Sequence, residues 1–175
     1  MKSDVIMITN RGEGFERARQ EAKKVSVYKE LNEKESLRML LCTEEMLSIA
    51  SIIDMELDAS FWVEGEGKNV ELHLTTNADL DALTRAQLIN AATSRKNEAA
   101  NSFIGKIRDV FEQAIASERP ANELSYETLT DIQGRDIQDP EWDQYECSVL
   151  HKLADNLKIS IRGSVVELIV SKSFA

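Results

Sequence analysis

The sequence predicts a two-layer α/β sandwich of the α+β class, in which helices cover one face of a mixed, mostly antiparallel sheet. A long apolar helix is expected over residues 35–54, and a β-hairpin with strands at 61–64 and 70–76 follows it directly. A second hairpin, over 157–170, closes the chain. In both hairpins apolar and polar residues alternate, which is typical of strands with one buried and one solvated side. Sheets of this kind carry helices on one side only.

Length and composition indicate one domain over residues 1–175. The 175 residues are 42% apolar and 30% charged, as in ordinary globular domains, which commonly run to ~100–200 residues. Cys42 and Cys147 fall in expected helices and are interpreted as reduced, small hydrophobic residues. The apolar run near the N-terminus is too short for a signal sequence, and no apolar segment approaches the ~18 residues of a membrane span. We therefore expect a cytoplasmic protein that does not enter a membrane.

The net charge of −10 argues against nucleic acid as a partner, because such binding depends on Lys and Arg contacts to phosphate. The charge is unevenly placed. Residues 118–146 carry nine acids against two arginines, whereas residues 84–108 carry five basic residues against one acid. The acidic stretch could meet a basic partner. The basic stretch either binds an anion or forms a solvated helix face that pairs with acids of the chain itself.

Before the central helix we expect a strand over 5–9, a glycine-containing loop and a mostly charged surface helix over 15–31. A thin apolar stripe that begins at Phe15 would hold this helix on the rest of the domain. Gly12 and Gly14 form only a lone Gly-x-Gly pattern. Their expected role is in the turn and the helix start rather than in phosphate binding.

The central helix carries the residues of greatest chemical interest. Met39, Cys42 and Met46 begin a series of apolar residues at three- and four-residue spacing, which predicts a helix packed on more than one side. Glu44 and Glu45 lie in its middle, with Glu45 on the ridge of Cys42 and so at the margin of the buried face. Glu45 is therefore either an acid near a pocket, where desolvation would raise its pKa, or a boundary residue with its carboxylate in water.

The first hairpin is expected to bury alternate residues from Val70 to Thr76 and to turn through a glycine-rich loop of moderate length over 65–69. His73 lies on the other side of its strand and has no second metal ligand nearby. It is interpreted as an exposed strand residue.

Between the two hairpins the pattern predicts three helices. Residues 77–79 would cap the first of them, and a short basic break separates it from the second. An acidic connection over 118–138 would serve as a lid, a binding loop or a mobile segment. The expected helices cover 80–92, 98–117 and 140–155, and Gly163 with Ser164 forms the turn of the closing hairpin.

This order of elements resembles the ATP-binding fold shared by histidine kinases, gyrase-like ATPases and bacterial anti-sigma-factor kinases, over residues 5–172. In that family a helical layer covers a mixed sheet, and the nucleotide lies between the helices, the sheet and a lid. The first sequence box of the family is a Glu on the apolar helix, followed four residues later by an Asn that holds Mg²⁺. The resemblance implies a histidine-kinase-type fold that binds ATP with Mg²⁺, in which Glu44 or Glu45 stands for the acid of that box.

The sequence departs from the family at both boxes. Ser48 and Ile49 stand where the asparagine would be, so the Mg²⁺ ligand is missing. After the strand at 70–76, the acid of the second box is matched only by Asp79, without the glycines that free the backbone. Three basic residues would compensate as phosphate contacts. The candidate site is then Glu45 as the catalytic base and Glu44, Asp79, Arg95, Lys96 and Lys106 as nucleotide-binding residues.

The resemblance implies a bacterial regulatory protein, similar to anti-sigma factors, with altered or vestigial ATP binding. It would act by binding a protein partner, such as a sigma factor or another regulator, or by forming a homodimer. One alternative is a non-catalytic interaction module, whose pocket is filled by side chains such as Met39, Met46 and Phe103. The other is an active ATPase or protein kinase with Glu45 as base. An open cleft lined by Glu45, Arg95 and Lys96 would favour ligand binding.

Overall fold

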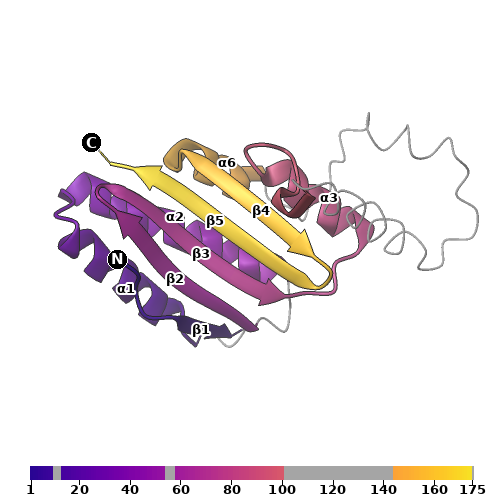
Figure 1. Cartoon of the computed structure of the whole chain (residues 1–175), viewed down its shortest axis with the longest axis horizontal. Coiled ribbons are helices and arrows are strands. Elements are labelled where there is room, and N and C mark those ends of the chain that lie inside the picture. The colour runs from indigo at the N-terminus through magenta and orange to yellow at the C-terminus, as the bar shows by residue number, and fades with distance from the viewer. Residues whose placement is uncertain (10–12, 54–57, 101–143, 175) are drawn as a thin grey trace, which may run out of the picture.

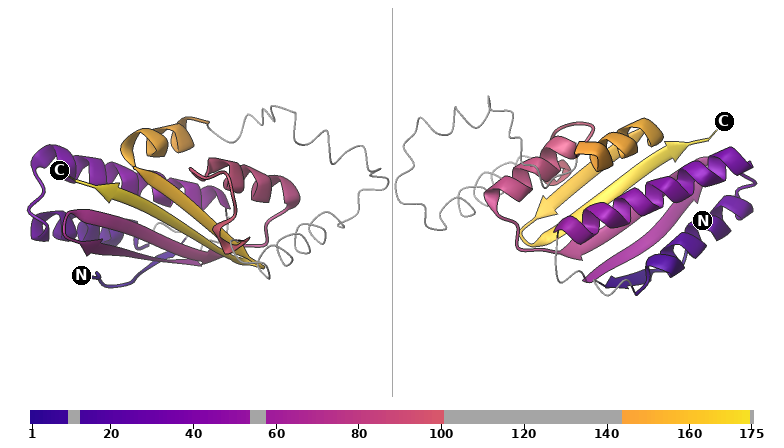
Figure 2. Two further views of the ribbon diagram at one scale, coloured as in Figure 1. Left: turned by 45° about the horizontal axis from the view of Figure 1, so that its top comes forward. Right: turned by 180° about the vertical axis from the view of Figure 1, so that it is seen from behind.

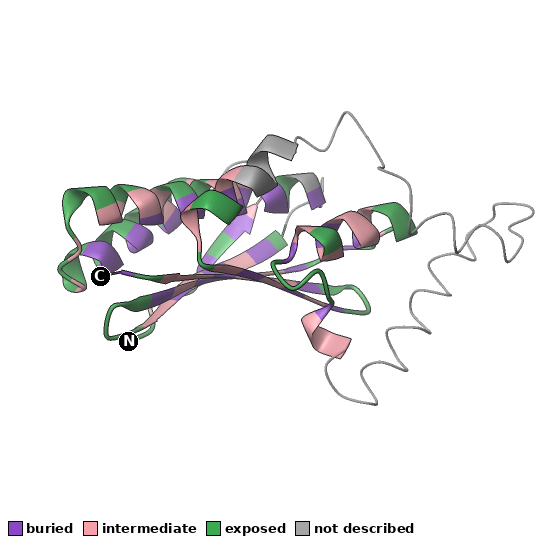
Figure 3. Ribbon diagram, turned by 90° about the horizontal axis from the view of Figure 1, so that it is seen from above, coloured by how far each residue is buried: buried purple, intermediate pink, exposed green. Residues whose placement is uncertain are grey.

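A computed structural model describes residues 1–9, 13–53, 58–100 and 144–174. These residues form an α+β fold of two layers, with an antiparallel sheet on one side and helices on the other (Figure 1). Seen along the sheet, α1, α2, α3 and α6 all lie on the same face (Figure 3). The strands are β1 (Ile6–Thr9), β2 (Asp58–Glu66), β3 (Asn69–Asn77), β4 (Asn156–Arg162) and β5 (Val165–Ser173). The helices are α1 (Phe15–Tyr28), α2 (Glu33–Ile53), α3 (Ala82–Ala91), the 3-10 turn η1 (Glu98–Ala100) and α6 (Gln144–Leu153).

The strand order is β1-β2-β3-β5-β4, and every pair is antiparallel. The prediction of a mixed sheet is therefore wrong for the described strands. Each hairpin supplies one antiparallel pair, and the second hairpin docks on the first through β5, which runs opposite to β3. The N-terminal strand β1 joins the outer edge of β2. The three interior strands are β2, β3 and β5.

Both predicted hairpins are confirmed, but the turn of the first is shorter than expected. Glu66 pairs with Asn69, so only Gly67 and Lys68 lie between the strands. Gly67 has φ of 55°, a left-handed conformation that glycine adopts at little cost and that suits a two-residue turn. The residues predicted as a loop thus belong largely to β2 and β3.

The central helix α2 begins at Glu33 with reciprocal capping bonds. The backbone N–H of Glu35 donates to Asn32 Oδ1 at 3.0 Å, and the backbone N–H of Asn32 donates to Glu35 Oε2 at 2.9 Å. This capping box satisfies two of the donors that a helix start leaves unpaired. The helix is not buried all round, since Leu37 is 57% exposed. α2 therefore packs on the sheet, α1 and α6, with one side in solvent.

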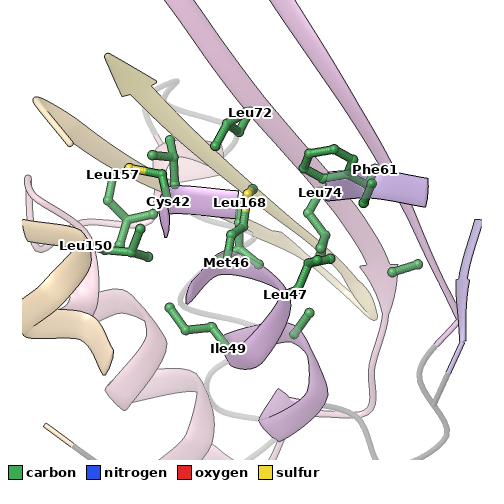
Figure 4. Close-up of a cluster of buried hydrophobic side chains, with 14 of the residues drawn as sticks. Cys42, Met46, Leu47, Ile49, Phe61, Leu72, Leu74, Leu150, Leu157 and Leu168 are labelled. Atoms are coloured by element: carbon green, nitrogen blue, oxygen red, sulfur yellow. The ribbon is translucent and has the colours of Figure 1, made fainter. Parts of the chain in front are cut away.

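The core lies between α2 and the sheet, as Figure 4 shows. Met46 and Leu47 of α2 meet strand residues such as Phe61, Leu74 and Leu168, all at most 2% exposed. The alternating residues of the closing hairpin are buried as predicted. Helix α6 adds Leu150 to this core from the side of β4. No helix in the described ranges combines the length and apolar character that crossing a bilayer requires.

The cap of α3 differs from the prediction. Asp81, not 77–79, is the N-cap, and its carboxylate accepts from the backbone N–H of Thr84 at 2.7 Å. This bond lowers the pKa of Asp81 from its usual value, because the backbone donor favours the charged carboxylate. The cap confines α3 to 82–91, shorter than the predicted 80–92. Of the predicted second helix, only residues 98–100 are described, as η1. The acidic connection over 118–138 and the first residues of the third helix lie outside the described residues, and the rest of the third helix corresponds to α6.

Candidate functional site

The two acids of the central helix lie on its surface side. Glu44 is exposed, and its carboxylate accepts from Arg19 Nη1 of α1 at 3.5 Å. Arg19 also bonds Glu16 on its own helix at 3.1 Å. Glu44 thus belongs to an ion pair between two surface helices, which contributes little to stability. Glu45 is half-buried, as expected for the margin of the apolar face.

The basic candidates lie at another place in the fold. Arg95 and Lys96 are exposed on a segment, residues 93–97, that runs along the free edge of β4. Asp79 is exposed just after β3. Helix α6 packs beside α2 and also contacts β4, whereas the 93–97 segment follows α3 and bonds to β4 (Figure 2). The α2 acids and the 93–97 segment are therefore on separate elements. Lys106 lies outside the described residues.

Segment 93–97 has a structural role, because it covers the edge of β4. The Asn97 side chain donates to the carbonyl of Ile161 and accepts from its N–H, both at 2.9 Å. Thr93 bonds Leu157 in a similar way: its backbone N–H donates to the carbonyl of Leu157 at 2.9 Å, and its hydroxyl accepts from the N–H of Leu157 at 2.8 Å. These contacts imitate a sixth strand, and they satisfy backbone groups that an edge strand would otherwise leave open. We name residues 93–97 the edge strap.

The helix–sheet interface, where the resemblance would place a nucleotide, is filled by side chains in the described part of the chain. Met39 and Met46 are 2% and 0% exposed there. A depression of about 700 Å³ lies elsewhere, at the β2–β3 turn end of the sheet, and is lined by none of the described nucleotide-site candidates. Phe103 lies outside the described residues.

Cys42 lies in the filled interface and is 1% exposed. Burial raises the pKa of its thiol to about 11, because a thiolate would be poorly solvated there. The thiol therefore stays protonated and unreactive at neutral pH. The prediction of a reduced, buried cysteine is confirmed for Cys42, and the side chain of Cys147 is outside the described residues.

The opposite side of the sheet carries a different surface, which we call the open face. It consists of the side chains of β2, β3, β4 and β5 that point away from α1, α2, α3 and α6, that is, the residues alternating with the buried ones (Figure 3). On the interior strands β2, β3 and β5 this face carries five acids and no lysine or arginine. The bases of the open face are on β4, at Lys158 and Arg162. The five acids are Asp58, Glu64, Glu66, Glu71 and Glu167.

The centre of the open face is an aromatic stack. The rings of Trp62 and His73, paired across β2 and β3, lie 4.9 Å apart between centroids and 7° from parallel. Ile169 of β5 flanks His73 on its other side. His73 is therefore only 7% exposed, and the prediction of an exposed strand residue is wrong. Recognising the two-residue turn would have given the register that places His73 opposite Trp62.

Both ring nitrogens of His73 are buried without a hydrogen-bond partner. The nearest carboxylate oxygen, Oε2 of Glu71, is 3.6 Å from Nε2, which is too long for a hydrogen bond. Buried polar groups are nearly always paired, so a native exception calls for an explanation. His73 is thus the most unusual polar group on the open face.

A lysine from the N-terminal segment covers the stack. Lys2 Nζ lies 4.6 Å from the centre of the Trp62 ring and 3.0 Å from Glu64 Oε1. The same Glu64 oxygen accepts from Trp62 Nε1 at 2.8 Å. These donors, Lys2 first and Trp62 second, lower the pKa of Glu64. The segment itself is held to β2 by backbone bonds, such as Ser3 N–H to Val63 O at 2.8 Å.

Comparison with models of known protein families finds no match, and comparison with curated proteins finds no significant match either. Among the described residues, no group of three or more His, Cys, Asp or Glu could hold a metal ion. The described geometry thus offers two candidate surfaces, the helical layer with its ion pairs and the open face with its buried aromatic stack.

Proposed function

We propose that this chain is a non-catalytic regulatory protein that binds a basic protein partner through the open face of its sheet. The observation that carries the proposal is the row of acids around an aromatic centre on the interior strands, which carry no Lys or Arg on this face. A base from outside these strands does lie against the acids, namely Lys2 of the N-terminal segment. Aromatic residues are enriched at protein interfaces, and complementary charge steers association and selects the partner.

The alternative of nucleotide binding has less support from the described geometry. Glu45, Arg95 and Lys96 lie on separate elements, and Met39 with Met46 fills the interface below α2. Protein binding is also the mode of action that the resemblance to anti-sigma factors implies. A sigma factor or comparable regulator that binds nucleic acid presents Lys and Arg on its surface, and it is therefore the first class of partner to test.

The proposal predicts that charge reversal on the open face weakens binding of a basic protein. Glu167 lies on β5, and Glu167→Lys should reduce the affinity for a purified, Lys/Arg-rich DNA-binding regulator by about tenfold, which equals ~1.4 kcal/mol. The binding should also weaken with added salt, since exposed charges are screened beyond ~8 Å at physiological ionic strength. Fluorescence anisotropy with a labelled partner measures both effects.

Glu13→Lys is the matched control, because Glu13 is exposed outside the sheet and the change in net charge is the same. An equal loss of affinity in both variants would mean attraction by overall charge alone and would overturn the open face as the binding surface. If sedimentation shows that the chain forms dimers and does not bind the partner, the open face would be assigned to a homodimer instead.

The proposal also predicts that ATP, with or without Mg²⁺, leaves the melting temperature unchanged. A ligand present at 100 times its dissociation constant would add ~2.7 kcal/mol to the free energy of unfolding. For a chain of this length that corresponds to a shift of roughly 5–10 °C, so a thermal-shift titration is decisive. A saturable shift that Glu45→Ala or Lys96→Ala abolishes would establish nucleotide binding and contradict the proposal.

A further inference from the structure

The contact of Lys2 with the open face has the features of a ligand in a site. Its ammonium group lies over the face of an indole and touches a carboxylate, which is how a free cation is bound by an aromatic residue and an acid. Lys2 itself is more than half exposed, with 53% of its side-chain surface in solvent. It is therefore bound at the surface by a short segment and can be displaced.

We propose that Trp62, Glu64 and Glu71 form a subsite for one lysine or arginine side chain of the basic partner, and that Lys2 occupies this subsite in the free protein. This subsite rests on the function proposed above, and it adds a way in which partner binding is regulated, namely competition with Lys2. Partner binding then requires the exchange of one cation for another. The N-terminal segment acts as an internal competitor that lowers the affinity for weakly basic surfaces.

His73 provides a second, independent indication of a ligand at this place. Its side chain is 9% exposed, its two ring nitrogens have no hydrogen-bond partner, and its Nε2 lies 3.6 Å from Oε2 of Glu71. A neutral imidazole has one N–H donor and one acceptor nitrogen, and neither nitrogen of His73 has a partner. A guanidinium group presents several donors in a planar fork, which suit both a carboxylate and an acceptor nitrogen. An arginine that enters beside Trp62 would donate to Glu71 and to the acceptor nitrogen of His73.

The neighbouring strand supports the same assignment. On β5, Ser171 Oγ donates to the other oxygen of Glu71, Oε1, at 3.1 Å, which fixes the carboxylate and leaves Oε2 directed to His73. On β2, Trp62 Nε1 holds Glu64. Two carboxylates, paired with each other across β2 and β3, are thus positioned beside the aromatic stack before any partner arrives. This preorganisation lowers the cost of binding.

The subsite is tested with a tetra-arginine peptide and the fluorescence of Trp62, in a Trp142→Phe background that leaves Trp62 as the one tryptophan. Removal of the competitor in Lys2→Met should lower the peptide concentration for half-maximal change by about three- to tenfold, the range expected from one cation–π contact and one exposed ion pair. Methionine retains an apolar stem over the ring. Glu64→Gln added to Lys2→Met should reverse the gain.

Lys23→Ala is the control for net charge, because Lys23 is exposed on α1. An equal gain in this control, or no gain in Lys2→Met with the fold intact by circular dichroism, would overturn the subsite. A second variant, Lys2→Gln, must give the same result as Lys2→Met. The two proposals fail separately: a Lys2 effect on the peptide without a Glu167→Lys effect on the protein partner would retain the subsite and reject the proposed function.

Discussion

Gly14→Ala is expected to lower the free energy of unfolding by ~3 kcal/mol or more. Gly14 precedes α1 with φ of 91°, and a Cβ built there would lie 2.0 Å from the carbonyl oxygen of Met7. An L residue in left-handed conformation costs ~1–2 kcal/mol on its own. The clash is with backbone, so β1 or α1 must also move, and either shift disturbs the packing of the buried Ile6 and Ile8.

Gly67→Ala separates conformational strain from the clash. Gly67 also has positive φ, 55°, but an added Cβ there meets nothing within 4 Å. This control should lose only the ~1–2 kcal/mol of strain. Urea denaturation of both variants measures the difference, and thermal denaturation should show a melting temperature for Gly14→Ala lower than wild type by roughly 6–12 °C. Equal losses in the two variants would show that β1 and α1 do not meet as closely as described.

The role of Gly14 could be predicted from the sequence, since a glycine between a strand and a helix points to a turn and a helix start. That no other residue fits at position 14 could not be predicted, because the close approach to Met7 depends on how the start of α1 packs against β1.

The same limit applies to the hairpins. Alternation identified which side of each strand is buried, but the register of the first hairpin depends on turn length. A loop of five residues and a turn of two place different partners opposite His73.

The candidate site illustrates a second limit. The acids of α2 and the bases of the edge strap are each visible in the sequence, but convergence is a property of the tertiary structure. Glu44 finds a partner in Arg19, 25 positions earlier in the chain. The open face was visible only as polar positions within alternating strands. Its concentration of acids on β2, β3 and β5 follows from a strand order that no local pattern specifies.

Asn97→Ala is expected to destabilise the chain by ~2–4 kcal/mol. Asn97 is 4% exposed, and its amide holds both the N–H and the carbonyl of Ile161. Alanine removes both partners at once, and each buried backbone group left unpaired costs ~1–3 kcal/mol. Ile161 itself stays apolar and buried, so the loss arises from hydrogen bonding rather than from the core.

Lys96→Ala, at the adjacent exposed position of the edge strap, is the matched control and should change stability by no more than ~0.5 kcal/mol. Urea denaturation compares the two variants. If Asn97→Ala is as stable as Lys96→Ala, the bonds of Asn97 to Ile161 contribute nothing to the fold, and the bases of the edge strap would again require a functional explanation.

The loss of Asn97 has a second consequence, because it exposes the edge of β4. An uncovered edge strand can pair with another chain, and natural sheets prevent this with covering segments and with charged residues, lysine above all. Arg95 and Lys96 flank the covered edge and are exposed, so they suit this protective role without any phosphate ligand. Asn97→Ala should therefore self-associate with rising concentration in sedimentation velocity, and Asn97→Ala with Lys96→Ala should do so at lower concentration. Monomeric behaviour of both variants would mean that Thr93 alone closes the edge.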